Sequence, residues 1–467
     1  MGRIARVSAM DGLRLGATVL APVVAQGVIV RRPRMTALAQ ALDTDRRAVR
    51  LLHRMRAKYG GGPLLVPIPL RPMLLVLDPE DVQRILAGTP EPFAADNREK
   101  RSALGHFEPD AVLVSHGRLR EDRRRFNEAV LETGQDAHRF SGAFQAVIRQ
   151  ELGPPARAPE LTWERFAPAW WRAVRRIVLG DGARDDTVLT DLLNRLRADA
   201  NWAYARPRRR GTYRRFTSRL RAHLDRAEPG SLAALAARTP ASDRTRPEGQ
   251  VPHWLFAFDA AGIAVFRALA LLATHPEHEE RARAESAGAP GGGRDGAGGG
   301  TGTAAARPFL AACVQESLRL WPTTLAILRD STTATHWGGG TVPGQTPFLV
   351  FSAFVNRDEE TGPSANRFTP RIWLDGAADD RWSIVPFSRG PAQCAGRNLV
   401  LDVTTGALAA LLAQGRFRVE PPTALAPGRD LPYSLDHFTL RFAVRQLEAV
   451  EGLGGRSLQD RAVHAEP

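Results

Sequence analysis

Cysteine is scarce in this chain of 467 residues, which contains only Cys313 and Cys394. Two cysteines cannot form the disulfide framework of a small secreted protein, so we expect a reducing, cytoplasmic environment. Long apolar runs are also missing near the start. Residues 15–30 are largely apolar but contain Pro22, Gln26 and Gly27, and they fall short of the ~20 residues that a spanning helix needs. We therefore expect a soluble N-terminal arm and no integral membrane anchor.

Acidic residues are the minority among the charged ones. The chain has 64 lysines and arginines against 50 aspartates and glutamates, which gives a formal net charge of +14. Such a charge attracts nucleic acid, anionic membranes or acidic proteins. A basic cluster with interleaved aromatic residues lies at 206–216, but no recognised nucleic-acid-binding motif accompanies it. We expect a solvated helical corner there and no nucleic-acid partner.

The stretch 386–399 combines an isolated cysteine with glycines and an aromatic residue. Cys394 precedes an apolar periodic segment, which predicts that it lies just before or at the start of a helix. Helix N-terminal amides favour an anion, so this position predicts a lowered thiol pKa and a thiolate that ligates a metal or attacks an electrophile. Gly390 and Gly396 remove side chains on either side of the sulfur, and Phe387 offers a flat apolar face. A bulky planar ligand fits this pattern.

Four residues here have the spacing Phe-x-x-Gly-x-x-x-Cys-x-Gly, namely Phe387, Gly390, Cys394 and Gly396. This spacing resembles the haem-binding loop of the cytochromes P-450, the haem-thiolate monooxygenases, and the chain is most similar to their soluble bacterial type. Residues 316–319, Glu-Ser-Leu-Arg, resemble the family's Glu-x-x-Arg helix, and residues 366–370 resemble the segment that follows it. The resemblance runs from about Tyr59 to about Val444.

The resemblance implies a mainly α fold with a smaller β-rich part, the cytochrome P-450 fold. It also implies haem b (iron protoporphyrin IX) as the cofactor, with Cys394 as the iron ligand. A single haem-thiolate domain would occupy residues 59–447, after an N-terminal arm and first helix at 1–58 and before a polar tail at 448–467. The stretch 286–303 is rich in glycine and alanine, which predicts a flexible linker.

The resemblance further implies which side chains bind the haem propionates. Residues 117–126 form a dense basic run on a predicted helix, which by charge alone would indicate a solvated face. In the family this helix carries a propionate-binding arginine, which Arg124 matches. Arg120 stands where Trp or His is usual, and Arg329 matches a second propionate-binding arginine. Ala392 replaces the basic residue usual two positions before the cysteine, so we expect Arg120 to compensate.

Glu316 and Arg319 are three residues apart on a helix predicted for 309–321, so they share one face. In the family such a pair stabilises the core on the haem side together with an arginine after the residue that Pro370 matches. Here Ile372 occupies that place and Arg371 lies one residue earlier, which leaves the third partner in doubt. Cys313 on the same helix is predicted to be a core residue.

Residues 254–273 are strongly apolar, with Asp259 and Arg267 as their only charges. This composition favours a buried core helix over a membrane span. The helix resembles the long distal helix of the family. Asp259 keeps the acid of its oxygen-activating motif, whereas Ala260 replaces the threonine whose hydroxyl normally helps hold a proton-delivering water. Our hypothesis is that Asp259, through water or a substrate hydroxyl, delivers protons past Ala260, so these two are the catalytic positions.

The implied reaction inserts one oxygen atom from O₂ into a small hydrophobic substrate of the secondary-metabolite or xenobiotic type. No reductase-like domain is visible, so we expect electrons from a separate acidic ferredoxin and its reductase, docked on the basic face of residues 118–125. Two alternatives stay open. The missing threonine permits a peroxide-driven peroxygenase, although Arg267 lies too far from Ala260 to hold a carboxylate as such enzymes do. The changes at Ala260, Ile372 and Ala392 permit a non-catalytic haem-bearing scaffold.

Periodicity predicts the remaining elements. Helices are expected at 36–58, 79–86, 139–179 and 187–204, and a strand pair at 64–70 and 73–77. Residues 88–114 have no clear period and are expected to form a long loop, which the resemblance would place over the substrate. Short strands are expected at 332–336, 341–342 and 348–354.

Overall fold

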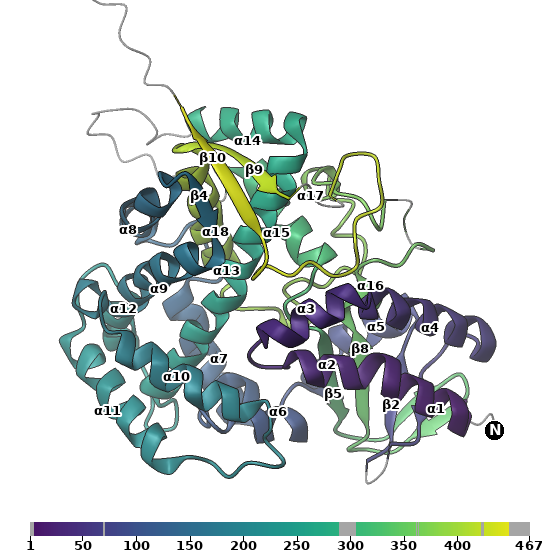
Figure 1. Ribbon diagram of the computed structural model, residues 1–467. Coiled ribbons are helices and arrows are strands. Elements are labelled where there is room, and N and C mark those ends of the chain that lie inside the picture. The colour runs from purple at the N-terminus through teal and green to yellow at the C-terminus, as the bar shows by residue number, and fades with distance from the viewer. Residues whose placement is uncertain are drawn as a thin grey trace, which may run out of the picture.

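The computed structural model describes residues 4–68, 71–288, 305–360, 362, 364–421 and 425–447. Within these ranges helices make up the larger part, and strands gather mainly at one side (Figure 1). The predicted fold class, mainly α with a smaller β-rich part, is therefore confirmed. The predicted tail at 448–467 and residues 289–303 of the predicted linker lie outside the described residues.

The helical segments, including 3₁₀ and π segments marked η, are α1 (Ala9–Leu15), η1 (Gly16–Leu20), α2 (Ala21–Gln26), α3 (Pro33–Ala41), α4 (Thr44–Tyr59), α5 (Pro79–Ala87), α6 (Arg98–Leu104), η2 (Val112–Val114), α7 (Gly117–Leu131), α8 (Ser141–Ala156), α9 (Trp163–Leu179), η3 (Asp181–Ala183), α10 (Thr187–Ala200), α11 (Arg210–Arg226), α12 (Leu232–Arg238), η4 (Pro247–Gly249), α13 (Val251–Thr274), α14 (Pro276–Gly288), α15 (Pro308–Leu320), α16 (Ser352–Val355), α17 (Arg371–Leu374), η5 (Gly390–Ala392) and α18 (Arg397–Leu412).

The strands are β1 (Leu64–Val66), β2 (Met73–Val76), β3 (Phe93–Ala94), β4 (Glu160–Thr162), β5 (Ala326–Ser331), β6 (Thr335–Trp337), β7 (Gly340–Val342), β8 (Pro347–Phe351), β9 (Gly415–Glu420) and β10 (Arg441–Gln446). The main sheet has the order β1-β2-β8-β5-β3, with β2 and β8 parallel and the other pairs antiparallel. Smaller sheets are β4-β10-β9 and the hairpin β6-β7.

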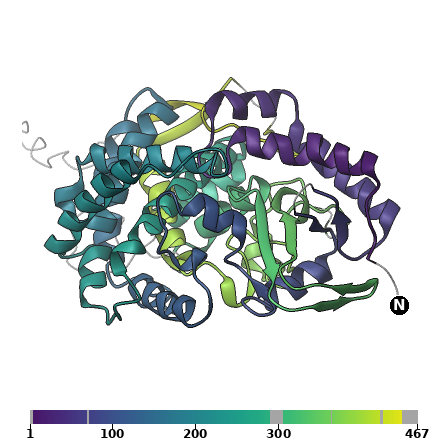
Figure 2. The same ribbon diagram turned by 90° about the horizontal axis from the view of Figure 1, so that it is seen from below.

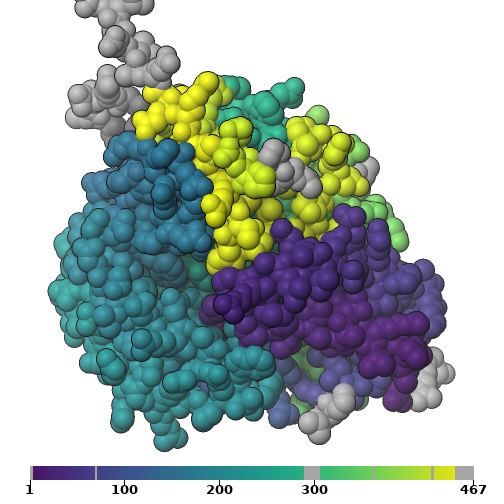
Figure 3. Space-filling model, in the orientation of Figure 1, coloured from purple at the N-terminus to yellow at the C-terminus, as the bar shows by residue number. Residues whose placement is uncertain are grey.

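The N-terminal helices are packed onto the β-rich part. Val7, Leu15 and Val19 are buried in the same hydrophobic core as Val66 and Leu75, and Figure 2 shows α1 to α4 lying along this side of the molecule. The arm also meets the C-terminal segment on one face (Figure 3), where the backbone N–H of Asp436 donates to Gln40 Oε1 at 2.5 Å. The predicted domain boundaries themselves stay a prediction.

Helix α13 runs through the larger core, as its apolar sequence predicts. The helical stretch Pro247–Thr274 is long and apolar enough to cross a membrane by length and composition, but 72% of its most apolar window is buried in the protein. Trp170 of α9 approaches so closely that its Nε1 donates to Phe258 O at 2.8 Å. A Cβ atom at Gly262 would lie 2.6 Å from that nitrogen. Glycine at 262 therefore allows the two helices to meet.

Several predicted elements differ in their boundaries. The helix predicted at 36–58 is two helices, because Asp43 adopts a left-handed conformation (φ 48°) between α3 and α4. The predicted loop 88–114 contains α6, which Asn97 caps by accepting the backbone N–H of Lys100 at 2.8 Å. Strand β4 interrupts the stretch 139–179, and α16 follows β8 within 348–354. The linker prediction also began too early, since α14 continues to Gly288.

Candidate functional site

The cysteine loop has the predicted position, since Cys394 lies three residues before α18. Its backbone N–H donates to Phe387 O at 2.9 Å, which folds the loop back on itself. Gly390 has a left-handed φ of 68°, and a Cβ atom there would lie 2.4 Å from Leu86 O. This position therefore requires glycine. A Cβ atom at Gly396 would meet only Leu131 Cδ1, at 3.7 Å, so the described chain leaves room beside the cysteine.

The predicted lowering of the Cys394 pKa is wrong for the protein by itself. Burial raises the pKa of this thiol and outweighs the N–H of Gly396 and the charges of Arg124 and Arg397, which lower it. The free-energy cost of desolvating the thiolate exceeds the stabilisation that the nearby N–H group and guanidinium groups provide. Cys394 nevertheless keeps some accessible surface, whereas Cys313 is fully buried on α15. Cys313 is a core residue as predicted, whereas Cys394 is not covered on every side by the described chain.

The predicted propionate arginines lie next to the cysteine loop. Arg124 of α7 donates from Nη1 to Gln393 O, at 2.7 Å, one residue before Cys394. Arg329 of β5 donates from Nε to Thr89 Oγ1 at 3.1 Å and from Nη2 to Ser388 Oγ at 3.4 Å. Burial and the charge of Arg120 lower the pKa of Arg329 to about 10. The fold therefore brings together basic residues from segments about 200 residues apart in sequence.

Lys100 of α6 joins Arg120 and Arg329 in a group that we call the cation cluster. Its Nζ donates to Ala95 O at 2.8 Å and to Leu328 O at 3.3 Å. Burial, followed by repulsion from Arg329, lowers the pKa of Lys100 well below its ordinary value. Burial and then repulsion from Arg124 also lower the pKa of Arg120. Among the described residues, no carboxylate forms an ion pair with any member of this cluster.

The residues present fit a haem. The partly exposed Cys394 lies near cations that burial destabilises and that form no ion pair in the described chain, and two propionate groups would provide paired charges. Within the described ranges, no group of three or more His, Cys, Asp or Glu side chains is arranged to hold a bare metal ion. A single thiol donor beside a cation cluster suits a metal whose other ligands belong to a macrocycle. Lys100 can also supply the basic group that Ala392 lacks.

Glu316 and Arg319 form a fully buried ion pair on α15, with exposed side-chain fractions of 0% and 2%. Arg319 also donates to the carbonyls of Asn356, Ala365 and Arg367, the last at 2.9 Å. The third partner is Trp373 of α17, whose Nε1 donates to Glu316 Oε2 at 3.0 Å. Arg371 is exposed and pairs with Asp375 instead. An indole N–H therefore fills the place for which the sequence suggested an arginine.

Asp259 has a partner from another helix. Arg197 of α10 donates from Nη2 to Asp259 Oδ2 at 2.5 Å, and its side chain is 1% exposed. Asp259 is 26% exposed, and its Oδ1 has no hydrogen-bond partner in the described part of the chain. Ala260 is also partly exposed. The carboxylate is thus held at one oxygen and open at the other.

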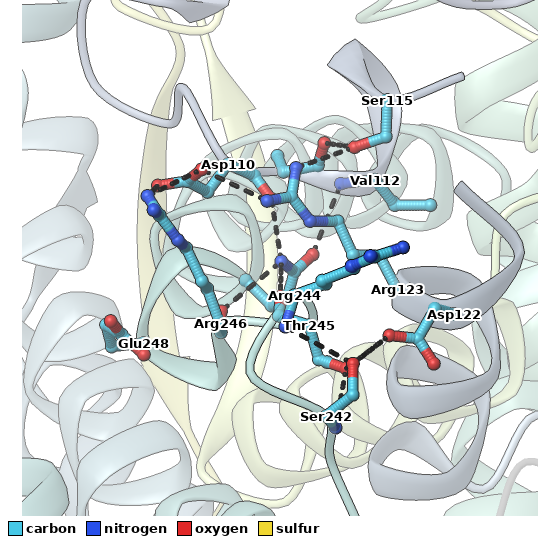
Figure 4. Close-up of polar contacts among 12 residues, drawn as sticks. Asp110, Val112, Ser115, Asp122, Arg123, Ser242, Arg244, Thr245, Arg246 and Glu248 are labelled. Atoms are coloured by element: carbon cyan, nitrogen blue, oxygen red, sulfur yellow. Dashed lines mark hydrogen bonds and ion pairs between the residues drawn. The ribbon is translucent and has the colours of Figure 1, made fainter. Parts of the chain in front are cut away.

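Two arginines that the sequence analysis named make hydrogen bonds within the fold. Arg267 donates to Trp321 O at 3.1 Å and to Leu435 O at 2.6 Å, so carbonyl groups already hold its guanidinium. Arg123 belongs to the predicted docking face but is buried, and it binds Asp110 at 3.0 Å and Ser115 at 2.8 Å (Figure 4). On α7 the side chains of Arg118 and Arg125 are exposed, whereas Arg120 and Arg123 are buried. The docking prediction is therefore restricted to the exposed residues.

A surface pocket of about 860 Å³ lies between α11 and the start of α13. Its rim carries Asp110, Arg246 and Glu248, and Figure 4 shows the Asp110 carboxylate between Arg123 and Arg246. Neither Cys394 nor any member of the cation cluster lines this pocket. The pocket is therefore separate from the site around Cys394.

The comparisons with known proteins, by sequence and by structure, find the same family. A sequence model of the family described as Cytochrome P450 matches residues 257–431. Cyclooctat-9-en-7-ol 5-monooxygenase of Streptomyces melanosporofaciens is 28% identical over 231 residues, which cover 46% of this chain and 50% of that protein. Cytochrome P450 714C3 of Oryza sativa subsp. japonica is 30% identical over 167 residues, or 35% of this chain and 32% of that protein. The chain thus spans at most half the length of these curated relatives.

Solved structures match over more of the chain. The structure described as retinoic acid bound cyanobacterial CYP120A1 has a TM-score of 0.66 and 16% identity, and the match covers 85% of this chain and 94% of that one. A cytochrome P450 described as CYP102L1 has a TM-score of 0.65 and 18% identity, with coverage of 86% and 98%. At these identities the likeness concerns the fold, which is the one that the sequence predicted.

Proposed function

The chain belongs to the cytochrome P450 superfamily, and on that premise we propose that it is a haem-thiolate monooxygenase that inserts one oxygen atom from O₂ into a small hydrophobic substrate. The observation that carries this proposal is the partly exposed Cys394 in a loop to which Arg124 donates a hydrogen bond, near desolvated cations that have no ion pair among the described residues. The proposal includes a cytoplasmic location, which suits two cysteines that are both free.

Each part of the site has a role in this proposal. Haem, when bound through a thiolate, supplies the activation of O₂. Cys394 binds the iron, and the Phe387 carbonyl holds the loop that presents the sulfur. Arg120, Arg124 and Arg329 would bind the propionates together with Lys100, and Arg124 also holds the loop through Gln393 O. The Glu316 and Arg319 pair stabilises the core behind this site.

Proton delivery is assigned to Asp259 in this proposal. Arg197 holds Oδ2, so Oδ1 is the atom free to accept a water or a substrate hydroxyl. Ala260 contributes no hydroxyl, and its small side chain leaves space at the same point of α13. Asp259 would pass protons to this space while the surrounding apolar residues limit the entry of bulk water.

Three turnover conditions test the proposed function. Product formation is measured with O₂, ferredoxin and reductase, then with peroxide alone, and then with neither. We expect turnover mainly in the first condition. Turnover with peroxide alone would favour the peroxygenase alternative. No turnover in any condition, combined with activation of a partner enzyme, would favour the scaffold alternative.

We predict that Lys100→Met has opposite effects on the two forms of the protein. In the haem-free protein it removes a desolvated cation that has no ion pair among the described residues, so the free energy of unfolding should rise. The folded pKa of Lys100 lies below its unfolded value of ~10.4, so the unfolded state binds more protons between these values and stability rises with pH there. The variant should lose this rise. Calorimetry of the haem-free protein from neutral to alkaline pH measures both effects.

In the haem-bound protein the same variant should release haem faster, by about 10-fold, because a charge-assisted contact to a propionate is lost. Lys58→Met is the matched control, since Lys58 is the other of the two lysines in the sequence and its side chain is 58% exposed. Transfer of haem to apomyoglobin measures the rate. Unchanged release from Lys100→Met would remove this residue from the propionate site.

We predict that Arg125→Glu and Arg118→Glu slow reduction by an acidic ferredoxin by about 10-fold at low salt, because both side chains are exposed on α7 and charge reversal affects steering. The difference should shrink as salt rises, since the Debye length is ~10 Å at 0.1 M. Stopped-flow absorbance measures the rate. Arg50→Glu on α4, also exposed, is the control. Equal rates for all variants at every salt concentration would place docking elsewhere.

A further inference from the structure

His253 lies on the face of α13 that also carries Phe256, Ala257 and Ala260. Residues separated by three, four and seven positions share one face of a helix, and all of these side chains are partly exposed although α13 crosses the core. Seven residues rise ~10 Å along a helix. His253 and Ala260 therefore lie on the same side of α13, about 10 Å apart along its axis.

A buried carboxylate fixes the orientation of His253. Glu108 is 0% exposed, and its oxygens lie 3.1 and 3.3 Å from His253 Nδ1. Burial opposes protonation of His253, but the charge and hydrogen bond of Glu108 win and raise its pKa. Nδ1–H thus donates to Glu108 in the charged form, and Nε2–H remains as a second donor.

Nε2 faces open space. The His253 side chain is 25% exposed, and within the described part of the chain its Nε2 has no hydrogen-bond partner. Pro252 lines the surface pocket beside α11, but His253 does not. Its accessible surface therefore lies on the side of α13 that also carries Ala260.

The surroundings of this donor are aromatic. The rings of His253 and Phe256 are 5.9 Å apart, and those of Phe107 and Phe256 are 5.6 Å apart. This side of α13 thus presents the oriented Nε2–H beside aromatic rings, and the Arg197 guanidinium, which pairs with Asp259, lies 4.9 Å from the centre of the Phe256 ring. A hydrophobic molecule that reached Ala260 without an acceptor would leave this donor buried and unpaired, which is unfavourable.

We propose that the substrate is a hydrophobic molecule that already carries a neutral oxygen acceptor, a hydroxyl or ketone, and that His253 Nε2 donates a hydrogen bond to this oxygen. A neutral group is preferred to a carboxylate, because Glu108 already balances the imidazolium and a second buried anion would lack a counter-charge. The proposal rests on the proposed function and specifies its substrate class. A reaction that installs an alcohol or ketone must therefore supply the substrate.

Matched probes test this inference. The haem-bound protein is titrated with decalin, decalol, decalone and decalin carboxylate, which share one skeleton, and dissociation constants come from optical difference spectra. The wild type should bind decalol and decalone about 10- to 100-fold more tightly than decalin, the ratio typical of a hydrogen bond to a charged donor. Decalin carboxylate should bind more weakly than decalol.

Double variants separate the loss of the hydrogen-bond donor from an effect on folding. Replacing His253 alone would leave Glu108 buried without a partner, so both residues are changed together. Glu108→Leu with His253→Phe removes the donor, and the preference for decalol over decalin should fall below about threefold, since no charged hydrogen bond remains. Glu108→Gln with His253→Gln keeps a neutral donor and should retain part of the preference. His336→Phe is the control, because the His336 side chain is exposed on β6.

Two results would overturn the inference. One is a wild type that binds decalin or decalin carboxylate as tightly as decalol, or that shows no preference. The other is an unchanged preference in the double variant that combines Glu108→Leu with His253→Phe. The ferrous carbonyl spectrum is recorded for every variant. A wild type without a thiolate-type spectrum would contradict the proposed function, whereas a normal spectrum with the wrong ligand preference would contradict only this inference.

Discussion

Replacing Cys394 by serine is expected to abolish the strongly red-shifted Soret band of the ferrous carbonyl complex. A hydroxyl is a far poorer donor to iron than a thiolate, and the band depends on thiolate ligation. The Cys394 backbone N–H bond to Phe387 O should survive the substitution, so the loop is expected to keep its shape. Absorbance of the dithionite-reduced, CO-treated protein measures the result.

Cys313→Ala is the matched control for this prediction. Cys313 is the other cysteine of the chain, lies buried on α15 and does not belong to the loop. This variant should keep the red-shifted band even if it lowers stability by removing buried atoms. A band that persists in Cys394→Ser, or that disappears only in Cys313→Ala, would remove Cys394 as the iron ligand.

Replacing Asp259 by asparagine should lower O₂-driven product formation by about 10²-fold, the scale typical of losing a general acid. The amide cannot carry the proton that we assign to Oδ1. Substrate binding and the ferrous carbonyl spectrum should persist. Ala260→Thr should leave turnover intact, because turnover does not require a hydroxyl at this position. Product analysis per electron consumed measures the loss, because failed proton delivery should release reducing equivalents as peroxide.

The Asp259 variant also leaves Arg197 buried beside a neutral group, which can lower stability by up to about 3 kcal/mol. A second variant separates this effect from proton delivery. Arg197→Met together with Asp259→Asn removes both charges, so the midpoint of thermal unfolding should return toward the wild-type value. Activity should stay low in this double variant. Recovered activity would mean that the loss in Asp259→Asn was structural and that protons take another path.

The sequence predicts best where function depends on close spacing. The loop around Cys394 and the pair Glu316 and Arg319 are each set by residues within a few positions of one another, so their pattern is visible without tertiary structure. The sequence also contains a pattern that indicates the buried face of α7. Arg120, Arg123 and Asn127 recur at helical spacing and are all buried, but they are polar residues within a run of charges, which by itself indicates a solvated face.

Other parts of the site depend on contacts between distant segments. Arg197 and Asp259 are 62 residues apart, and only the tertiary fold brings the side chain from α10 to the one on α13. Lys100 lies on α6, a helix of seven residues with Leu104 as its one buried side chain, so no apolar period marked it. Its role near Arg329 appears only when α6 is placed beside β5. The thiol pKa was mispredicted because burial of Cys394 is a tertiary property.

The indole of Trp373 changes the charge of the buried network around Glu316. A guanidinium at this place would leave the group with a net charge of about +1 in an environment of low polarity, where every unbalanced charge is costly. With Trp373 as the third donor, one carboxylate and one guanidinium cancel, and the remaining contacts are carbonyls and N–H groups. The ion pair and its direct contacts thus carry no net charge, so they add less to the positive charge of the cation cluster than a second guanidinium would.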